Sequence, residues 1–111
     1  MSTLSLRNIL RENVENRLNI TKIETLVEKV LADVKGAKDT KITELYSVLC
    51  TQRCALNAFP YTSFNIFEWQ IMVGSVRATL DSLRGEALSL STNEDCVRAL
   101  IVALDESMLT T

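Results

Sequence analysis

Cysteine is the residue with the most potential chemistry in this sequence, because histidine is absent. Zinc held by Cys50, Cys54 and Cys96 would need a fourth ligand, and no histidine can supply it. Cys50 and Cys54 stand one helical turn apart, which is not the spacing of a zinc knuckle, and a disulfide between them would be strained. We therefore expect free thiols, with Cys96 in the core and the other two at the edge of an apolar helix face.

Catalytic groups of other kinds do not assemble in the sequence. It has no glycine-rich phosphate loop and no G-x-S-x-G nucleophile motif. The acidic pairs Glu94–Asp95 and Asp105–Glu106 are neighbours in sequence, and on a helix such neighbours point about 100° apart, so they do not form acid–base dyads. We expect no enzyme activity, no cofactor and no metal.

A weak signal for nucleic-acid binding lies in residues 32–45. Their apolar and glycine spacing resembles a helix-turn-helix, with Gly36 at the turn and lysines around it. Between Lys22 and Arg53, however, 6 basic residues face 5 acidic ones, so the electrostatic term that drives phosphate binding is nearly absent. Two capped helices joined by a glycine turn explain the same residues. In the nucleic-acid alternative, the contacting residues would be Lys38, Lys41 and Thr43.

The elements that position these residues are all predicted to be helices. A chain of 111 residues with three glycines and one proline has too few turn residues for a β-sandwich or barrel. Capping patterns at Thr21 with Glu24 and at Asn65 with Glu68 mark helix starts, and Gly36 marks a helix end. We predict one all-helical domain, a compact bundle of about five helices over residues 3–18, 22–35, 41–58, 66–84 and 93–108.

The helix over 66–84 carries two apolar stripes, where a surface helix needs only one. The broad stripe consists of Trp69, Met72, Val73, Val76, Leu80 and Leu83. The second stripe consists of Phe67, Ile71, Gly74 and Ala78. Either this helix is central and surrounded by the others, or its second stripe meets another chain, with the small residues allowing close approach.

Two other regions add apolar surface. The turn before residue 66 gathers the aromatic side chains Tyr61 and Phe64, which either form a core corner or contribute to an interface. The helix over 93–108 is apolar on more than one side, with Val102 off its main stripe. The candidate protein-interface residues are therefore Tyr61, Phe64, Phe67, Ile71, Gly74, Ala78 and Val102.

Charge and targeting signals narrow the class further. The net charge is −2, from 12 basic and 14 acidic residues, which suits neither a phosphate binder nor a DNA mimic. No secretory signal or membrane-spanning run is visible, and an odd number of cysteines favours a reducing compartment. We expect a cytoplasmic protein-interaction module, such as an adaptor, inhibitor or assembly subunit. Its partner would be another protein, and a homodimer is one form this could take. A nucleic-acid-binding regulator is the alternative.

Overall fold

Four α-helices make up most of the computed structural model, which describes residues 20–59, 63, 65–86 and 94–108. No strand occurs among these residues, which confirms the all-helical class. The helix predicted over residues 3–18 lies outside them. The helices are α2 (Ile20–Val34), α3 (Thr40–Asn57), α4 (Ile66–Gly85) and α5 (Glu94–Met108).

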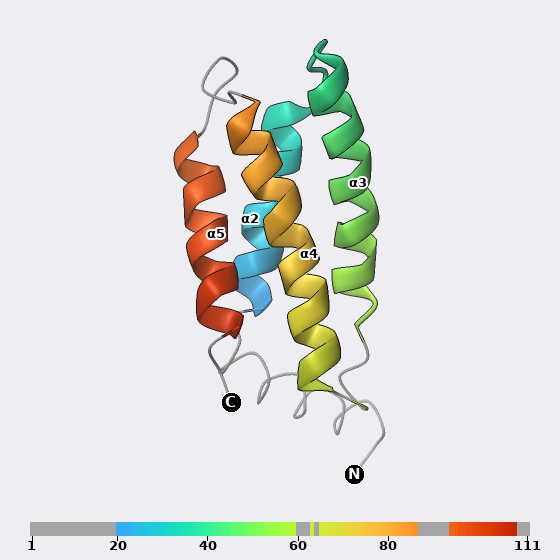
Figure 1. Ribbon diagram of the computed structural model, residues 1–111, viewed down its shortest axis with the longest axis vertical. Helices are drawn as coiled ribbons and strands as arrows, with labels where there is room; N and C mark the ends of the chain where they lie inside the picture. Colours follow the sequence, from blue (N-terminus) through green and yellow to red (C-terminus); the bar gives the residue numbers. More distant parts are fainter. Residues whose placement is uncertain (1–19, 60–62, 64, 87–93, 109–111) are drawn as a thin grey trace.

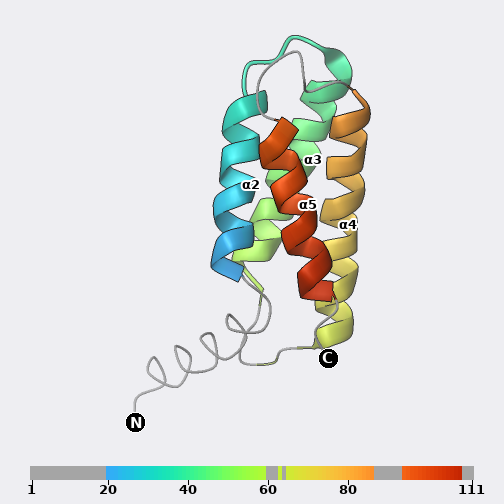
Figure 2. The same ribbon diagram turned by 90° about the vertical axis from the view of Figure 1, so that its left-hand side faces the viewer.

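The four helices form a ring in which each packs against two neighbours. α2 and α4 both contact α3 and α5, so α2 and α4 lie diagonally across the bundle. In Figure 1, α4 is in front, α2 is behind it, and α3 and α5 stand on either side. Figure 2 shows the same ring from the side of α5. Successive helices run in opposite directions, which is the up-down-up-down arrangement that short connections favour.

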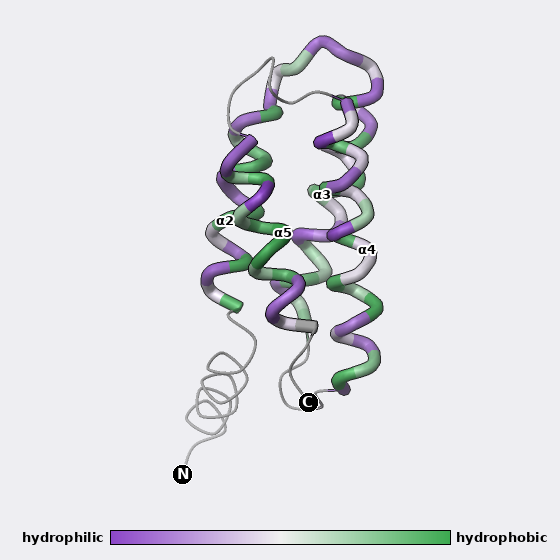
Figure 3. Tube along the Cα trace, turned by 60° about the vertical axis from the view of Figure 1, so that its left-hand side comes forward, coloured by the Kyte–Doolittle hydropathy of each residue, from purple (hydrophilic) through white to green (hydrophobic). Residues whose placement is uncertain are grey.

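Each helix turns an apolar face into this ring. Hydrophobic and hydrophilic residues are interspersed along the helices in Figure 3, as is typical of amphipathic helices. Removing these faces from water is the main driving force for the fold. The completely enclosed apolar side chains among the described residues are Ile23, Val27, Leu49, Trp69, Val73, Val76, Leu80, Leu83, Leu100, Ala103 and Leu104.

Local capping fixes where the helices end, and one predicted start is wrong. Gly36 adopts φ +83°, the left-handed conformation expected after a helix. Asp39 caps α3 by accepting a hydrogen bond from the backbone N–H of Ile42 at 3.1 Å. The predicted start at residue 22 with Thr21 as the cap is incorrect, because Thr21 lies inside α2. Ile20, the residue before Thr21, is buried in the core. Its packing there stabilises helical structure on the N-terminal side of Thr21.

Candidate functional site

The start of α4 is held by a well-made cap. The side-chain Oδ1 of Asn65 accepts hydrogen bonds from the backbone N–H groups of Phe67 at 2.9 Å and Glu68 at 3.3 Å. Glu68 also places a negative charge in the first turn, where the helix dipole favours it. The first turn, and Phe67 within it, is therefore fixed by local interactions.

The rotation of α4 about its axis is set by its buried face. Trp69 is fully enclosed, and its ring meets Phe59 edge to face, with centroids 5.2 Å apart and planes at 78°. Val73, Val76 and Leu80 continue the enclosed face along the helix. Turning α4 away from this orientation would expose all of these side chains, so its opposite face must point to solvent.

The second apolar stripe of α4 lies on that opposite face. Phe67 is 71% exposed and Ile71 is 74% exposed. Ala78 is exposed and Gly74 partly exposed. At 100° per residue these four positions fall within a sector of about 60°, and they extend over about 17 Å of helix. The structure thus places Phe67, Ile71, Gly74 and Ala78 together on one solvent-facing surface, which we call the α4 stripe.

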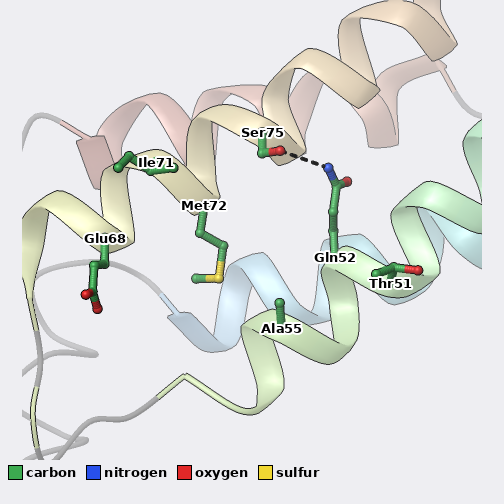
Figure 4. A pocket seen from close by; sticks show the side chains of 7 residues that line it. All are labelled: Thr51, Gln52, Ala55, Glu68, Ile71, Met72 and Ser75. Atoms are coloured by element: carbon green, nitrogen blue, oxygen red, sulfur yellow. Dashed lines mark hydrogen bonds between the residues drawn. The ribbon is translucent and has the colours of Figure 1, made fainter.

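A shallow groove between α3 and α4 adjoins the α4 stripe and shares Ile71 with it (Figure 4). Its volume is about 320 Å³. The amide Nε2 of Gln52 donates a hydrogen bond to Ser75 Oγ at 3.3 Å across the groove, while Gln52 Oε1 is buried without a partner among the described residues. The lining residues are Thr51, Gln52, Ala55, Glu68, Ile71, Met72 and Ser75.

The α3 side of this surface was not found from the sequence. Val48 is 45% exposed and lies one turn before Gln52 on α3. Its position on α3 lies off the helix face that packs into the core. Its apolar character was therefore the only signal for it in the sequence. Val48 extends the exposed surface along α3 beyond the groove, which Ala55 already lines.

Val102 is exposed on α5, the helix next to α4. An ion pair joins Arg77 of α4 to Asp105 of α5, and Arg77 also lies 3.7 Å from Asp81. Because α4 and α5 are antiparallel, Val102 lies about 14 Å from Ile71 along the helix axes but within about 3 Å of the level of Ala78, and it lies on a different helix from the stripe. The interface residues predicted together are therefore divided, and Tyr61 and Phe64 lie outside the described residues.

The turn between α2 and α3, which the nucleic-acid alternative concerns, has a different geometry from a helix-turn-helix. That motif joins its helices at roughly 90–120°, whereas α2 and α3 lie antiparallel and side by side (Figures 1 and 2). Lys38 and Lys41 are exposed. The hydroxyl of Thr43 is already used, because it donates to the carbonyl oxygens of Asp39 at 2.9 Å and Ala37 at 3.3 Å.

Cys96 lies in the core as predicted, whereas Cys54, which was predicted at the edge of an apolar face, is exposed. Cys96 is 7% exposed, and burial raises the pKa of its thiol. Cys50 is half-buried and Cys54 is exposed, and all three are free thiols. Among the described residues, no group of three or more cysteine or acidic side chains is placed to hold a metal ion.

Arg53 lies beside Cys50 and Cys54 on α3, and it forms an ion pair with the neighbouring helix α2. Its Nη1 is 3.4 Å from Glu28 Oε2 on α2. The Glu28 carboxylate raises the pKa of the Arg53 guanidinium. The hydrogen bond with Cys50 raises the pKa of Tyr46. The Arg53–Glu28 contact joins α3 to α2, and it accounts for a charged residue on the apolar side of α3.

The chain was compared with models of protein families, with curated proteins and with solved structures, and none of them matches it. Within the described part of the chain, no helix combines the length and apolar character needed to span a bilayer. The interpretation of the α4 stripe therefore depends on its own geometry.

Proposed function

We propose that the chain is a non-enzymatic protein-binding module and that it binds its partner through the α4 stripe. The observation that carries this proposal is the exposure of two large apolar side chains on consecutive turns of one helix, Phe67 at 71% and Ile71 at 74%. Single exposed hydrophobic residues are common on protein surfaces, whereas contiguous ones are typical of interaction sites.

The rest of the surface supports helix-on-helix binding. Gly74 and Ala78 follow the two large residues and have little or no side chain, so a partner helix could approach α4 closely there. The opposite face of α4 is enclosed in the core, so the helix backbone that carries the stripe is held in place before binding. A preorganised surface loses less conformational entropy on association, and binding is correspondingly stronger. An aromatic anchor such as Phe67 is typical of interface hot spots.

Photo-crosslinking in the cells that produce the protein tests this function. Benzoylphenylalanine placed at Phe67 should give a protein adduct of discrete mass. Adding Ile71→Asp should abolish that adduct, because it places a charge on the stripe one turn away. The matched control carries the same photoprobe at Thr25, an exposed position on α2. An adduct from position 67 that is no stronger than that from position 25, or one unaffected by Ile71→Asp, would overturn the proposal.

A further inference from the structure

The α4 stripe is asymmetric along its length, since its large side chains lie at one end and its small ones at the other. Its midpoint falls between Met72 and Val73. Phe67 and Ala78 are equally far from that point on either side, and so are Ile71 and Gly74. A two-fold axis through the midpoint, perpendicular to α4, would therefore place each large residue of one copy opposite a small residue of the other.

We propose that the partner of the α4 stripe is a second copy of this chain, bound by antiparallel α4–α4 packing about that axis. This inference rests on the proposed function and names its partner. Phe67 of each copy packs on Ala78 of the other, and Ile71 packs on Gly74. A parallel arrangement would instead set Phe67 against Phe67 and Gly74 against Gly74, which separates the helices at one end and leaves a gap at the other.

The charges around the stripe permit this arrangement. The four stripe residues are uncharged, and the nearest charges lie on its two flanks. Glu68 lines the α3 side, and Arg77 pairs with Asp105 on the α5 side. In the antiparallel dimer the two Glu68 side chains would be about 14 Å apart along the axis, and so would the two Arg77 side chains. This exceeds the Debye length of about 8 Å at physiological salt, so like charges are largely screened.

The available area predicts a reversible dimer. A phenylalanine offers roughly 150–250 Å² of surface, so Phe67 at 71% exposure contributes on the order of 140 Å². With a similar contribution from Ile71 and smaller ones along the stripe and groove, the dimer buries on the order of 1,000 Å² in total. Specific, stable interfaces bury at least about 1,200 Å² in total, so this area lies at the low end. We therefore expect a dimer that dissociates on dilution, rather than an obligate dimer.

Sedimentation velocity on the full chain, from about 1 µM to about 1 mM, tests the association. The mass should rise from monomer to dimer over this range. Ile71→Asp should remain monomeric throughout, while Thr25→Asp, an exposed position on α2, which lies diagonally opposite α4, should dimerise like the wild type. Circular dichroism confirms that both variants keep their helix content. A wild-type chain that stays monomeric at 1 mM, or a dimer equally weakened by Thr25→Asp, would overturn the inference.

Disulfide trapping tests the register. In a background with Cys50→Ser and Cys54→Ser, Phe67→Cys and Ala78→Cys chains are oxidised separately and as a mixture. The antiparallel register predicts a crosslinked dimer only in the mixture, because a disulfide needs Cα atoms within about 7 Å. The mixed dimer also keeps one native Phe67–Ala78 contact. Efficient crosslinking of Ala78→Cys alone would indicate parallel packing and overturn the proposed register.

The photoprobe at Phe67 separates failure of this inference from failure of the proposed function. An adduct with the mass of two chains, lost with Ile71→Asp, supports both. An Ile71-dependent adduct to a different protein overturns self-association and leaves protein binding standing. An adduct to residues 1–19 of the same chain would show that the stripe is covered internally, and it would overturn both.

Discussion

Paired alanine substitutions on α4 would establish which of its two apolar stripes is core. Leu80 is completely buried, whereas Ile71 is 74% exposed, although both are large aliphatic residues on the same helix. Truncating a buried leucine to alanine costs roughly 2–5 kcal/mol, because transfer energy is lost and a cavity remains. Leu80→Ala should therefore lower the free energy of unfolding by about 3 kcal/mol.

Ile71→Ala should leave that free energy nearly unchanged. Fully burying an isoleucine stabilises a protein by about 1.5–3 kcal/mol, so the buried quarter of Ile71 contributes about 0.5 kcal/mol. Alanine regains a few tenths of a kcal/mol through its better helix propensity. The net change should stay within about 0.5 kcal/mol of zero.

Urea unfolding followed by circular dichroism measures both changes. The protein should be at about 5 µM, with sedimentation velocity confirming that it is monomeric there, because association would otherwise add to the apparent stability. The slope of free energy against urea should be the same in both variants. If Leu80→Ala has no folded baseline, Val76→Ala, also fully buried, gives a smaller loss of the same sign. A loss above about 2 kcal/mol for Ile71→Ala would refute the assignment of the stripe to the surface.

Two further predictions concern the bundle itself. Gly36→Ala should destabilise the chain by about 1–2 kcal/mol in the same urea assay, because φ +83° is strained for any residue with a Cβ. An unchanged free energy of unfolding would show that the turn has another conformation. Burial raises the pKa of the Cys96 thiol, so the native state holds this proton longer than the unfolded state does. Stability should therefore fall as pH rises above the ordinary thiol value of about 8.5. Cys96→Ala should flatten that pH dependence and Cys54→Ser should not, whereas equal slopes in all three proteins would contradict thiol burial as its cause.

Local signals in the sequence predicted the described helices well. Asp39 and Asn65 act as caps through their own side chains, and Gly36 ends α2 through its backbone freedom, so none of the three depends on distant contacts. The start of α2 was predicted less well, because the burial of Ile20 depends on the assembled core. Local sequence patterns do not contain that information.

The candidate site was visible in the sequence only as two competing stripes. Periodicity groups Phe67 with Ile71, but it does not say which face of α4 meets the core. That choice depends on α3 and α5 flanking α4 and on α2 closing the ring behind it. The position of Val102 relative to the stripe could not be inferred either, because it depends on how α5 packs beside α4, and contacts between these helices, such as the Arg77–Asp105 ion pair, join residues far apart in sequence.

The apolar character of the α4 stripe has no explanation in the folding of the described bundle. Three-quarters of the Ile71 side chain contributes nothing to the core, and a polar residue there would improve solubility at little cost in stability. The same surface does use charge where charge is compatible with packing, as Arg77 and Asp105 show. Local choices that conflict with the fold are expected where function requires them. Phe67 and Ile71 are the described residues at which that conflict is greatest, so they are the first positions at which to test for a partner.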